Sequence, residues 1–367
     1  MMFRTLLIGA VFALAAGPAM AQSSDAAGSA KDIVQRFSQP NPPWNGPTTG
    51  PKAEAGKLIV YVSTDQRNGG ARGVGEGMAE AAKFIGWKTR VLDGQGTVSG
   101  RSSALSEAIS LHPDVIVLGG IDANEQAAVI ERAAKSGIKI IGWHATASAG
   151  PDEKLSVFNN ITTDPLAVAR AAASLAVVNS DSKAGVVIFT DSTYKVAVAK
   201  SDEMANVIKA CKTCELLTVI DTPLSDVSTR MPPLTSNLLA KHGAKWTYAL
   251  SINDLTFDFM TPALASAGIA GDGEPHNISA GDGSAAAFER IRNKQYQVAT
   301  VAEPLRLQGW QVVDEANRAL NGEKPSGFVP LPHLFTAENI AFDGGKNNEY
   351  DPDNGYQDAY KKIWGVK

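Results

Sequence analysis

The sequence predicts an α/β protein with two similar Rossmann-like lobes, each built on a parallel sheet, joined by a multi-strand hinge with a ligand cleft between them. Short apolar runs rich in Val and Ile alternate with helical patterns from Lys57 onward. The same order of elements occurs a second time after Thr162. The 367-residue chain is long enough for two domains with cores of their own.

The first residues have the pattern of a secretory signal peptide. A cationic start at Arg4 precedes an apolar run and small residues up to Ala21. The run is too short to span a bilayer comfortably, so an N-terminal anchor is the weaker alternative. We expect residues 1–21 to be removed and the mature protein to be soluble in the periplasm. Residues 22–55 are rich in Pro and small polar residues, which predicts a linker with extended pieces and with Trp44 docked on the first lobe.

Strands buried on both faces and alternating with helices specify a parallel sheet with right-handed crossovers. In the first lobe, Asp122 is expected to cap the third helix. The expected strands there are 58–62, 88–92, 114–118 and 138–142, and the helices 72–85, 103–111 and 124–136.

The second series begins where Asp164 is expected to cap a helix that has Pro165 in its first turn and runs through Val178. Its expected strands are 185–189, 216–220, 246–251 and 277–280, and its further helices 196–210, 229–241 and 257–267. A strand at 298–301, a helix at 305–320 and an extended tail follow. We therefore assign 56–162 plus 304–330 to the first lobe and 163–303 plus 331–367 to the second.

Composition excludes some classes of partner and limits the redox chemistry. The 34 basic and 38 acidic residues give a net charge of −4, so nothing indicates binding to nucleic acid or to an anionic membrane. Cys211 and Cys214 are the only cysteines, and in an oxidising compartment they are expected to form a local disulfide. Redox chemistry or metal binding are the alternatives, but a reactive pair sits at a helix N-terminus and this one follows a helix.

Polar side chains gather just after the predicted strands, at the edge where ligands bind in such sheets. Carboxylates and amides bridge hydroxyl groups, and an aromatic face covers the apolar side of a sugar-like ring. The alternative for each single Asp or Asn is a helix cap or a turn. The candidate ligand-binding residues from these positions are Gln66, Arg67, Asn68, Asp122, Trp143, His144, Tyr194, Asn253, Asp282 and Glu303.

Other chemistries fit the sequence less well. The stretch "STDQRNGGARGVGEG" and Asp93 are similar to a dinucleotide fingerprint, but five polar residues stand between the strand and the first glycine. These glycines also suit a helix start whose thin face packs closely against the sheet. No Gly-x-Ser-x-Gly elbow is present, and only His144 among the histidines is placed at a cleft. "DPDNG" lacks the spacing and the closing acid of a calcium loop. We expect no catalysis, no cofactor and no metal.

Together these features resemble the ribose- and galactose-type periplasmic binding proteins, the type I sugar-binding components of ABC importers. The strings that carry the resemblance include "VIVLGGIDANEQAAVIERAAKSGIKIIGW", "YALSINDLTFDF" and "HNISAGDGSAAAFERIRN". The resemblance implies sugar contacts from Asn253, Asp282 and Glu303. It also implies a contact from Asn68, and one from Lys200 in place of the family's Arg.

Two departures from the family pattern bear on the ligand. Gly69 and Gly70 stand where the family has an aromatic pair, and Trp143-His144 replaces the family's Asp-Arg. Loss of that Asp-Arg pair removes a charged clamp on adjacent hydroxyls. The resemblance therefore implies a modified sugar, a polyol or a partly apolar small molecule, with Trp143 available to stack on it.

The resemblance also implies a mechanism and partners. We expect the lobes to close about crossovers near 161–164, 280–282 and 301–303, and an ABC permease to recognise the closed form. The family is usually monomeric. The alternative is a periplasmic sensor that presents its ligand to a chemoreceptor or a sensor kinase.

Overall fold

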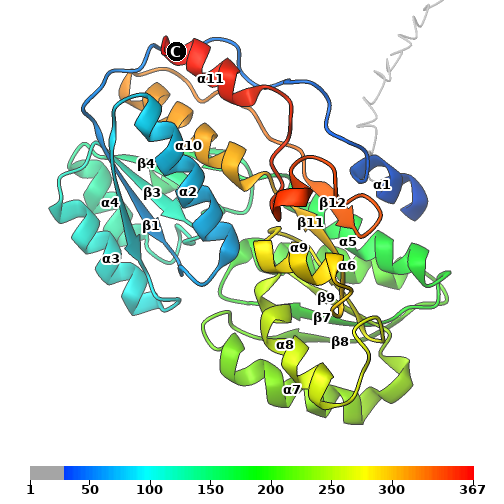
Figure 1. Ribbon diagram of the computed structural model, residues 1–367. Coiled ribbons are helices and arrows are strands. Elements are labelled where there is room, and N and C mark those ends of the chain that lie inside the picture. Colours follow the sequence, from blue (N-terminus) through cyan, green and yellow to red (C-terminus); the bar gives the residue numbers. More distant parts are fainter. Residues whose placement is uncertain (1–28) are drawn as a thin grey trace, which may run out of the picture.

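The computed structural model describes residues 29–367 and confirms the predicted fold class (Figure 1). Two lobes lie side by side, and each has a six-stranded sheet between layers of helices. The predicted signal peptide and the first residues of the linker lie outside the described residues. Between residues 29 and 367, no helix combines the length and the apolar character that crossing a membrane requires.

The first lobe is built on the strand order β2-β1-β3-β4-β6-β5. Its strands are β1 (Leu58–Ser63), β2 (Lys88–Asp93), β3 (Val115–Gly119), β4 (Lys139–Trp143), β5 (Gly150–Asp152) and β6 (Val157–Ile161). The helices around it are α2 (Gly69–Phe84), α3 (Val98–Ser110), α4 (Ala127–Lys135) and α10 (Leu305–Leu320). All strand pairs are parallel except β5 with β6, so the carboxyl ends of the parallel strands meet at one edge.

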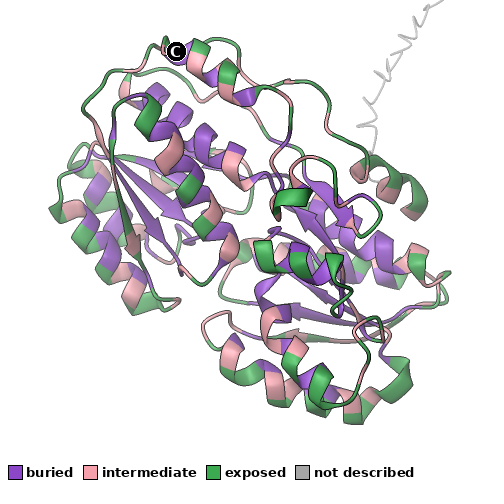
Figure 2. Ribbon diagram, in the orientation of Figure 1, coloured by how far each residue is buried: buried purple, intermediate pink, exposed green. Residues whose placement is uncertain are grey.

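The second lobe repeats this plan with the strand order β12-β11-β10-β9-β7-β8. Its strands are β7 (Gly185–Thr190), β8 (Glu215–Asp221), β9 (Tyr248–Ser251), β10 (His276–Ser279), β11 (Gln297–Ala302) and β12 (His333–Thr336). Its helices are α5 (Pro165–Asn179), α6 (Lys195–Ala210), α7 (Val227–His242), α8 (Leu255–Ser266) and α9 (Ala285–Arg292). Only β12 runs antiparallel to its neighbour. Figure 2 shows the same division in both lobes, with buried central strands and outer helices that expose one face.

The predicted central strands and helices are present, and the differences lie at their ends and in short elements. Helix α2 begins at Gly69 because the Asn68 side chain accepts the backbone N–H of Ala71, at 3.1 Å. Asp164 caps α5 as expected, accepting from the N–H groups of Leu166 and Ala167. Four short elements were not predicted: β5, β6, β12 and α9. They are too short to give a clear periodic pattern, and in β6 two asparagines also interrupt the apolar run.

The glycines at the start of α2 are explained by close packing. A Cβ atom at Gly77 would lie 2.6 Å from the backbone oxygen of Arg306 on α10, so only glycine allows the two helices to approach this closely. The prediction was packing against the sheet. Gly75 fits it, since a Cβ atom there would lie 3.2 Å from the Tyr61 ring of β1, but Gly77 packs against α10 instead.

The chain ends in a helix, α11 (Tyr356–Trp364), so the predicted extended tail is wrong for these residues. This helix packs on the first lobe, whereas 331–367 was predicted to belong to the second. Its buried aromatic side chains explain this. Trp364 stacks on Trp310 of α10 with ring centroids 5.6 Å apart, and its indole N–H donates to Asp314, at 2.9 Å. Only the first part of that segment, with β12, belongs to the second sheet.

The predicted linker contains a helix, α1 (Ala30–Phe37), which a capping box between Ser29 and Asp32 begins. Its apolar side chains Ile33, Val34 and Phe37 pack on the core of the second lobe. The chain then crosses to the first lobe, where Trp44 packs against Phe328 and Tyr360. The expected docking of Trp44 is confirmed, whereas helix α1 was not predicted.

The crossings between the lobes match two of the three predicted positions. The chain passes between the sheets after β6, through 162–164, and after β11, through 303–304. A third crossing, 321–332, joins α10 to β12. The predicted crossover at 280–282 is wrong, because this turn joins β10 to α9 and β10 pairs with β11 in the same sheet.

Cys211 and Cys214 form a disulfide in the turn between α6 and β8, as their spacing predicts. The bridge closes the C-terminal end of α6 and lies away from the strand ends that face the other lobe.

The packing of α11 leads to a stability prediction. We expect Trp364→Ala to lower the free energy of unfolding by about 3–5 kcal/mol, because it removes a buried aromatic ring and leaves Asp314 without its indole partner. Urea denaturation measures this difference. Phe342→Ala is the control, since Phe342 is 45% exposed. Equal losses in the two variants would contradict the placement of α11.

Candidate functional site

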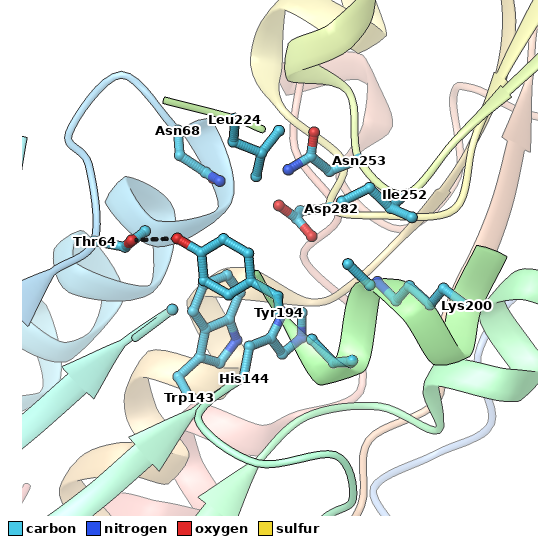
Figure 3. Close-up of a pocket in the computed structure, with 13 residues that line it drawn as sticks. Thr64, Asn68, Trp143, His144, Tyr194, Lys200, Leu224, Ile252, Asn253 and Asp282 are labelled. Carbon is cyan, nitrogen blue, oxygen red and sulfur yellow. Dashed lines mark hydrogen bonds between the residues drawn. The ribbon is translucent and has the colours of Figure 1, made fainter. Parts of the chain in front are cut away.

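A cavity of about 60 Å³ lies between the two lobes, at the carboxyl ends of their strands (Figure 3). Both lobes contribute side chains to it, so the cavity is complete only when they are together. Its lining residues are Thr64, Asn68, Gly120, Trp143, His144, Tyr194, Val196, Ala197, Lys200, Leu224, Ile252, Asn253 and Asp282.

Seven of the predicted site residues line this cavity: Asn68, Trp143, His144, Tyr194, Lys200, Asn253 and Asp282. The site also contains residues that the sequence analysis did not select. Thr64 follows β1 directly, and a search for polar residues at strand ends finds it. Val196, Ala197, Leu224 and Ile252 are apolar, so that search gives no signal for them.

Three predicted residues near the strand ends do not line the cavity. The Arg67 guanidinium is about half exposed and forms an ion pair with Asp65, at 2.7 Å. Gln66 is held by its backbone N–H, which donates to Asp93 at 3.1 Å. Asp122 accepts the N–H of Asn124 at 2.8 Å, as a turn-forming Asp does. The turn alternative therefore describes Asp122 better than a ligand contact. The expectation that Asp122 caps the third helix is wrong, because α4 begins at Ala127 with Gln126 at its N-cap position.

Two amide side chains face the cavity from opposite lobes. The Oδ1 atom of Asn68 accepts the N–H of Ala71, and that of Asn253 accepts the N–H of Leu255, each at 3.1 Å. These bonds fix the orientation of both amides. Figure 3 shows their nitrogen atoms turned toward the space between them, so each can donate hydrogen bonds to a ligand.

Asp282 is positioned by a second carboxylate, Asp254. One oxygen of Asp254 accepts the backbone N–H groups of Asp282, Gly283 and Ser284, at 3.1, 2.8 and 2.9 Å. The other oxygen accepts from the Gln297 side chain, at 2.8 Å. These bonds hold the turn after β10 in one shape, so Asp254 acts on the site through Asp282.

Asp282 also explains why glycine stands at position 70. A Cβ atom there would lie 2.7 Å from the Cβ of Asp282, so a side chain at this position would push the lobes apart. The Gly69-Gly70 pair that replaces the family's aromatics therefore brings the Asp282 carboxylate against the first turn of α2.

Burial raises the pKa of Asp282 to about 6. The charges of Lys200 and His144 oppose this shift, and those of Glu303 and Asp254 add to it. Asp282 is thus a buried carboxylate that the surrounding charges compensate only in part.

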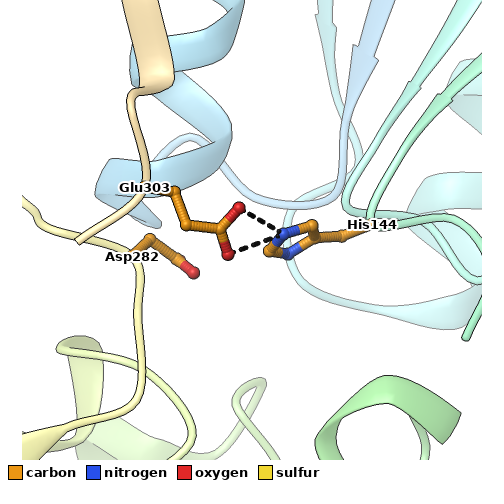
Figure 4. Close-up of side chains that lie close together, drawn as sticks. All are labelled: His144, Asp282 and Glu303. Carbon is orange, nitrogen blue, oxygen red and sulfur yellow. Dashed lines mark hydrogen bonds and ion pairs between the residues drawn. The ribbon is translucent and has the colours of Figure 1, made fainter. Parts of the chain in front are cut away.

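Glu303 does not line the cavity, and Figure 4 shows its carboxylate facing the His144 ring, with Asp282 nearby. Its carboxylate contacts Nε2 of His144 at 2.9 and 3.1 Å and accepts from the Gln308 amide at 2.8 Å. It also accepts the N–H of Thr163, at 3.3 Å, and lies 3.9 Å from Nζ of Lys200. Glu303 is therefore a buried support of the site rather than part of the cavity wall.

Burial alone would raise the pKa of the Glu303 carboxyl, but its partners reverse the shift. The His144 and Lys200 charges, together with hydrogen bonds from His144 and Gln308, hold the pKa of Glu303 well below its usual range. The Glu303 carboxylate is therefore charged at neutral pH.

One ligand atom from each of His144, Asp282 and Glu303 lies within 4.8 Å of the others. An imidazole and two carboxylates form a donor set that divalent cations accept. Here, however, His144 already bonds Glu303 and the Lys200 ammonium lies beside the same carboxylate. The geometry favours an internal ion network over a metal site.

The Trp143 ring has less freedom to stack on a ligand than the sequence suggests. The His144 ring lies parallel to it, with centroids 4.1 Å apart and planes 8° apart. The indole N–H of Trp143 donates to Gln308, at 2.9 Å. His144 thus covers one face of Trp143, and the indole is tied into the network around Glu303.

The position of Asp282 leads to a pH prediction. Because its pKa in the folded protein is above its value in the unfolded chain, the folded state binds the extra proton between about pH 4 and 6, and the contribution of Asp282 to stability falls as pH rises through this window. We expect Asp282→Asn to gain stability relative to wild type by about 2–3 kcal/mol between pH 4 and pH 7. Denaturation at the two pH values measures the difference, and a constant difference would contradict it.

Solved structures with the same fold include several solute-binding proteins. An ABC transporter solute-binding protein from Agrobacterium vitis with bound allitol is 18% identical, with a TM-score of 0.65, covering 79% of this chain and 98% of its own. One from Bacillus halodurans with bound myo-inositol is 17% identical, with a TM-score of 0.64, covering 80% and 98%. A sugar ABC transporter protein from Yersinia enterocolitica is 14% identical, with a TM-score of 0.69, covering 86% and 100%.

No curated protein matches the chain. The family model described as "Periplasmic binding protein domain" matches residues 59–324. This range includes every residue that lines the cavity and both sheets, apart from the edge strand β12 and Leu58, the first residue of β1. On the strength of this match and of the two-lobed fold, the chain belongs to the periplasmic binding protein domain family.

Proposed function

We propose that this protein captures a small neutral carbohydrate, a sugar or a polyol, between its lobes and delivers it to an ABC permease in the inner membrane. The observation that carries the proposal is the meeting of hydrogen-bonding side chains from both lobes in one cavity. Asn68 comes from the first lobe, and Lys200, Asn253 and Asp282 come from the second. The mature protein acts in the periplasm, after removal of residues 1–21.

The chemistry of these side chains suits hydroxyl groups. The Asn68 and Asn253 amides and the Lys200 ammonium donate, whereas the Asp282 carboxylate accepts. A hydroxyl group both donates and accepts, so a polyhydroxylated ligand can satisfy all four. Val196, Leu224 and Ile252 supply apolar wall for the carbon skeleton.

The charges around the cavity favour a neutral ligand over a sugar acid. Lys200 stands against two buried carboxylates, Asp282 and Glu303. A ligand carboxylate would add a further negative charge in a region of low dielectric, where repulsion is strong. Hydroxyl groups bring no such cost.

The two-lobed architecture provides the transport mechanism. Ligand contacts made from both lobes are complete only in the closed form, so ligand shifts the population toward it. A permease that recognises the closed form then receives loaded protein selectively. We assign the site to binding without chemical conversion.

Calorimetric titration tests the ligand class. We expect at least one of allitol, myo-inositol, D-allose and L-arabinose to bind, and D-gluconate and D-glucuronate not to bind. Asp282→Ala and Asn253→Ala should each weaken that binding by about 1–3 kcal/mol, because a ligand hydroxyl loses its buried partner.

Arg67→Ala is the matched control, since Arg67 lies in the same loop as Asn68 but is directed away from the cavity. It should bind as wild type does. Binding of the acids alone, or binding unaffected by both cavity variants, would contradict the proposal.

A further inference from the structure

Two segments outside residues 59–324, the range that matches the family model, connect the lobes in addition to the three crossings. The first, residues 38–51, is here called the arm. It follows α1 on the second lobe and runs to the first lobe. The second, residues 337–355, joins β12 of the second sheet to α11 on the first lobe and is here called the C-terminal crossing. Figure 1 shows the arm in blue and the C-terminal crossing in orange-red, both in the upper part of the view.

The arm is fixed to both lobes. At its start, α1 packs its apolar side chains on the core of the second lobe. At its end, the Arg318 guanidinium of α10 donates to the carbonyl oxygen of Thr49, at 2.5 Å, and the Asn317 amide donates to that of Pro51, at 2.8 Å. Both donor side chains are buried. The arm therefore spans the lobes with a firm contact at each end.

Tyr350 joins the arm, the C-terminal crossing and the third crossing, 321–332. This tyrosine is only 2% exposed, and its hydroxyl donates to the carbonyl oxygen of Leu331, in the third crossing, at 3.1 Å. The same hydroxyl accepts a hydrogen bond from the Asn41 amide of the arm. The backbone N–H of Asn41 also donates to Asp343 of the C-terminal crossing, at 3.0 Å. One buried hydroxyl thus ties three connections between the lobes to one another.

Trp44 provides a second tie. Its ring centroid lies 5.0 Å from that of Phe328, in the third crossing, and 5.3 Å from that of Tyr360, on α11. The indole N–H of Trp44 donates to the carbonyl oxygen of Pro47, at 3.1 Å, which fixes the orientation of the ring. The arm therefore contacts the third crossing through an aromatic ring as well as through Tyr350.

The two ties are separated by a short and stiff piece of chain. Pro42 and Pro43 stand between Asn41 and Trp44, and each proline ring fixes φ. Three residue steps span at most about 11 Å, even when fully extended. When two lobes rotate, the hinge segments change their backbone angles and move relative to one another. Segments that are tied at both ends of such a spacer can do so only over a limited range.

We propose that the arm and the C-terminal crossing form a brace on the hinge, which limits how far the lobes open in the absence of ligand. The brace does not hold the lobes closed. It permits opening and closing within a restricted range, and ligand drives the closure as described above. The brace goes beyond the proposed function, because it sets the amplitude of the lobe motion whatever the ligand is.

Small-angle scattering of the unliganded mature protein tests the brace. Tyr350→Phe keeps the ring but removes both hydrogen bonds of the hydroxyl. We therefore expect wider-open molecules to gain about tenfold in population, and the radius of gyration to exceed that of wild type. Trp44→Ala, which removes the ring contacts of the arm, should also increase the radius of gyration, and the double variant should increase it further.

Tyr296→Phe is the matched control. Tyr296 is also a buried tyrosine, and its hydroxyl donates to a carbonyl oxygen, that of Ile269, at 2.9 Å. It precedes β11, at the end of the strand away from the crossings. This variant should scatter as wild type does. Circular dichroism checks that each variant is folded, and Tyr350→Phe decides the question if Trp44→Ala does not fold.

A radius of gyration of Tyr350→Phe equal to or smaller than that of wild type would overturn the proposal. So would an equal increase in Tyr296→Phe, because the change would then follow from the loss of any buried hydroxyl. No ligand is present in these measurements. A failure of the brace therefore leaves the titrations of the proposed function standing, and a lack of carbohydrate binding leaves the scattering result standing.

Discussion

The buried carboxylate of Glu303 is the constraint on which the rest of the site depends. It lies where the chain passes from β11 to α10. It also accepts the backbone N–H of Thr163, which belongs to the crossing after β6. A charge in such a place is costly unless it is paired and hydrogen-bonded. His144, Gln308 and Lys200 meet that requirement, and each is thereby fixed at the base of the cavity. The stability of the crossing and the shape of the site therefore have the same origin.

Around this centre, each lobe positions its own ligand-facing groups through backbone hydrogen bonds. The Asn68 amide is oriented because it caps α2, and Asp282 is oriented because Asp254 accepts three N–H groups of its turn. Glycine at position 70 then lets the Asp282 carboxylate approach the first turn of α2. The features that looked like departures from a family pattern thus belong to one arrangement, in which the lobes meet closely over a small, charge-compensated cavity.

Much of this arrangement could be predicted from the sequence because alternating elements and polar strand ends leave a strong local pattern. Seven of the eleven predicted site residues line the cavity. Gln66 and Arg67 do not, because the direction of a loop side chain depends on neighbours such as Asp65 and Asp93, which the sequence does not place. The apolar wall gave no signal, since apolar residues after strands look like core. The placement of α11 depends on long-range aromatic packing, which no local pattern records.

The unfolding free energy of Glu303→Gln tests the central claim most directly. Removing this charge deprives both His144 and Lys200 of the Glu303 carboxylate, and breaking a buried ionic contact in this way costs about 3–5 kcal/mol. Glu80→Gln is the control, because the pair of Glu80 with Arg306 is more than one-quarter exposed and contributes about 1 kcal/mol or less. The account predicts a loss of about 3 kcal/mol or more for Glu303→Gln, together with loss of carbohydrate binding. Stability and binding equal to those of wild type would contradict it.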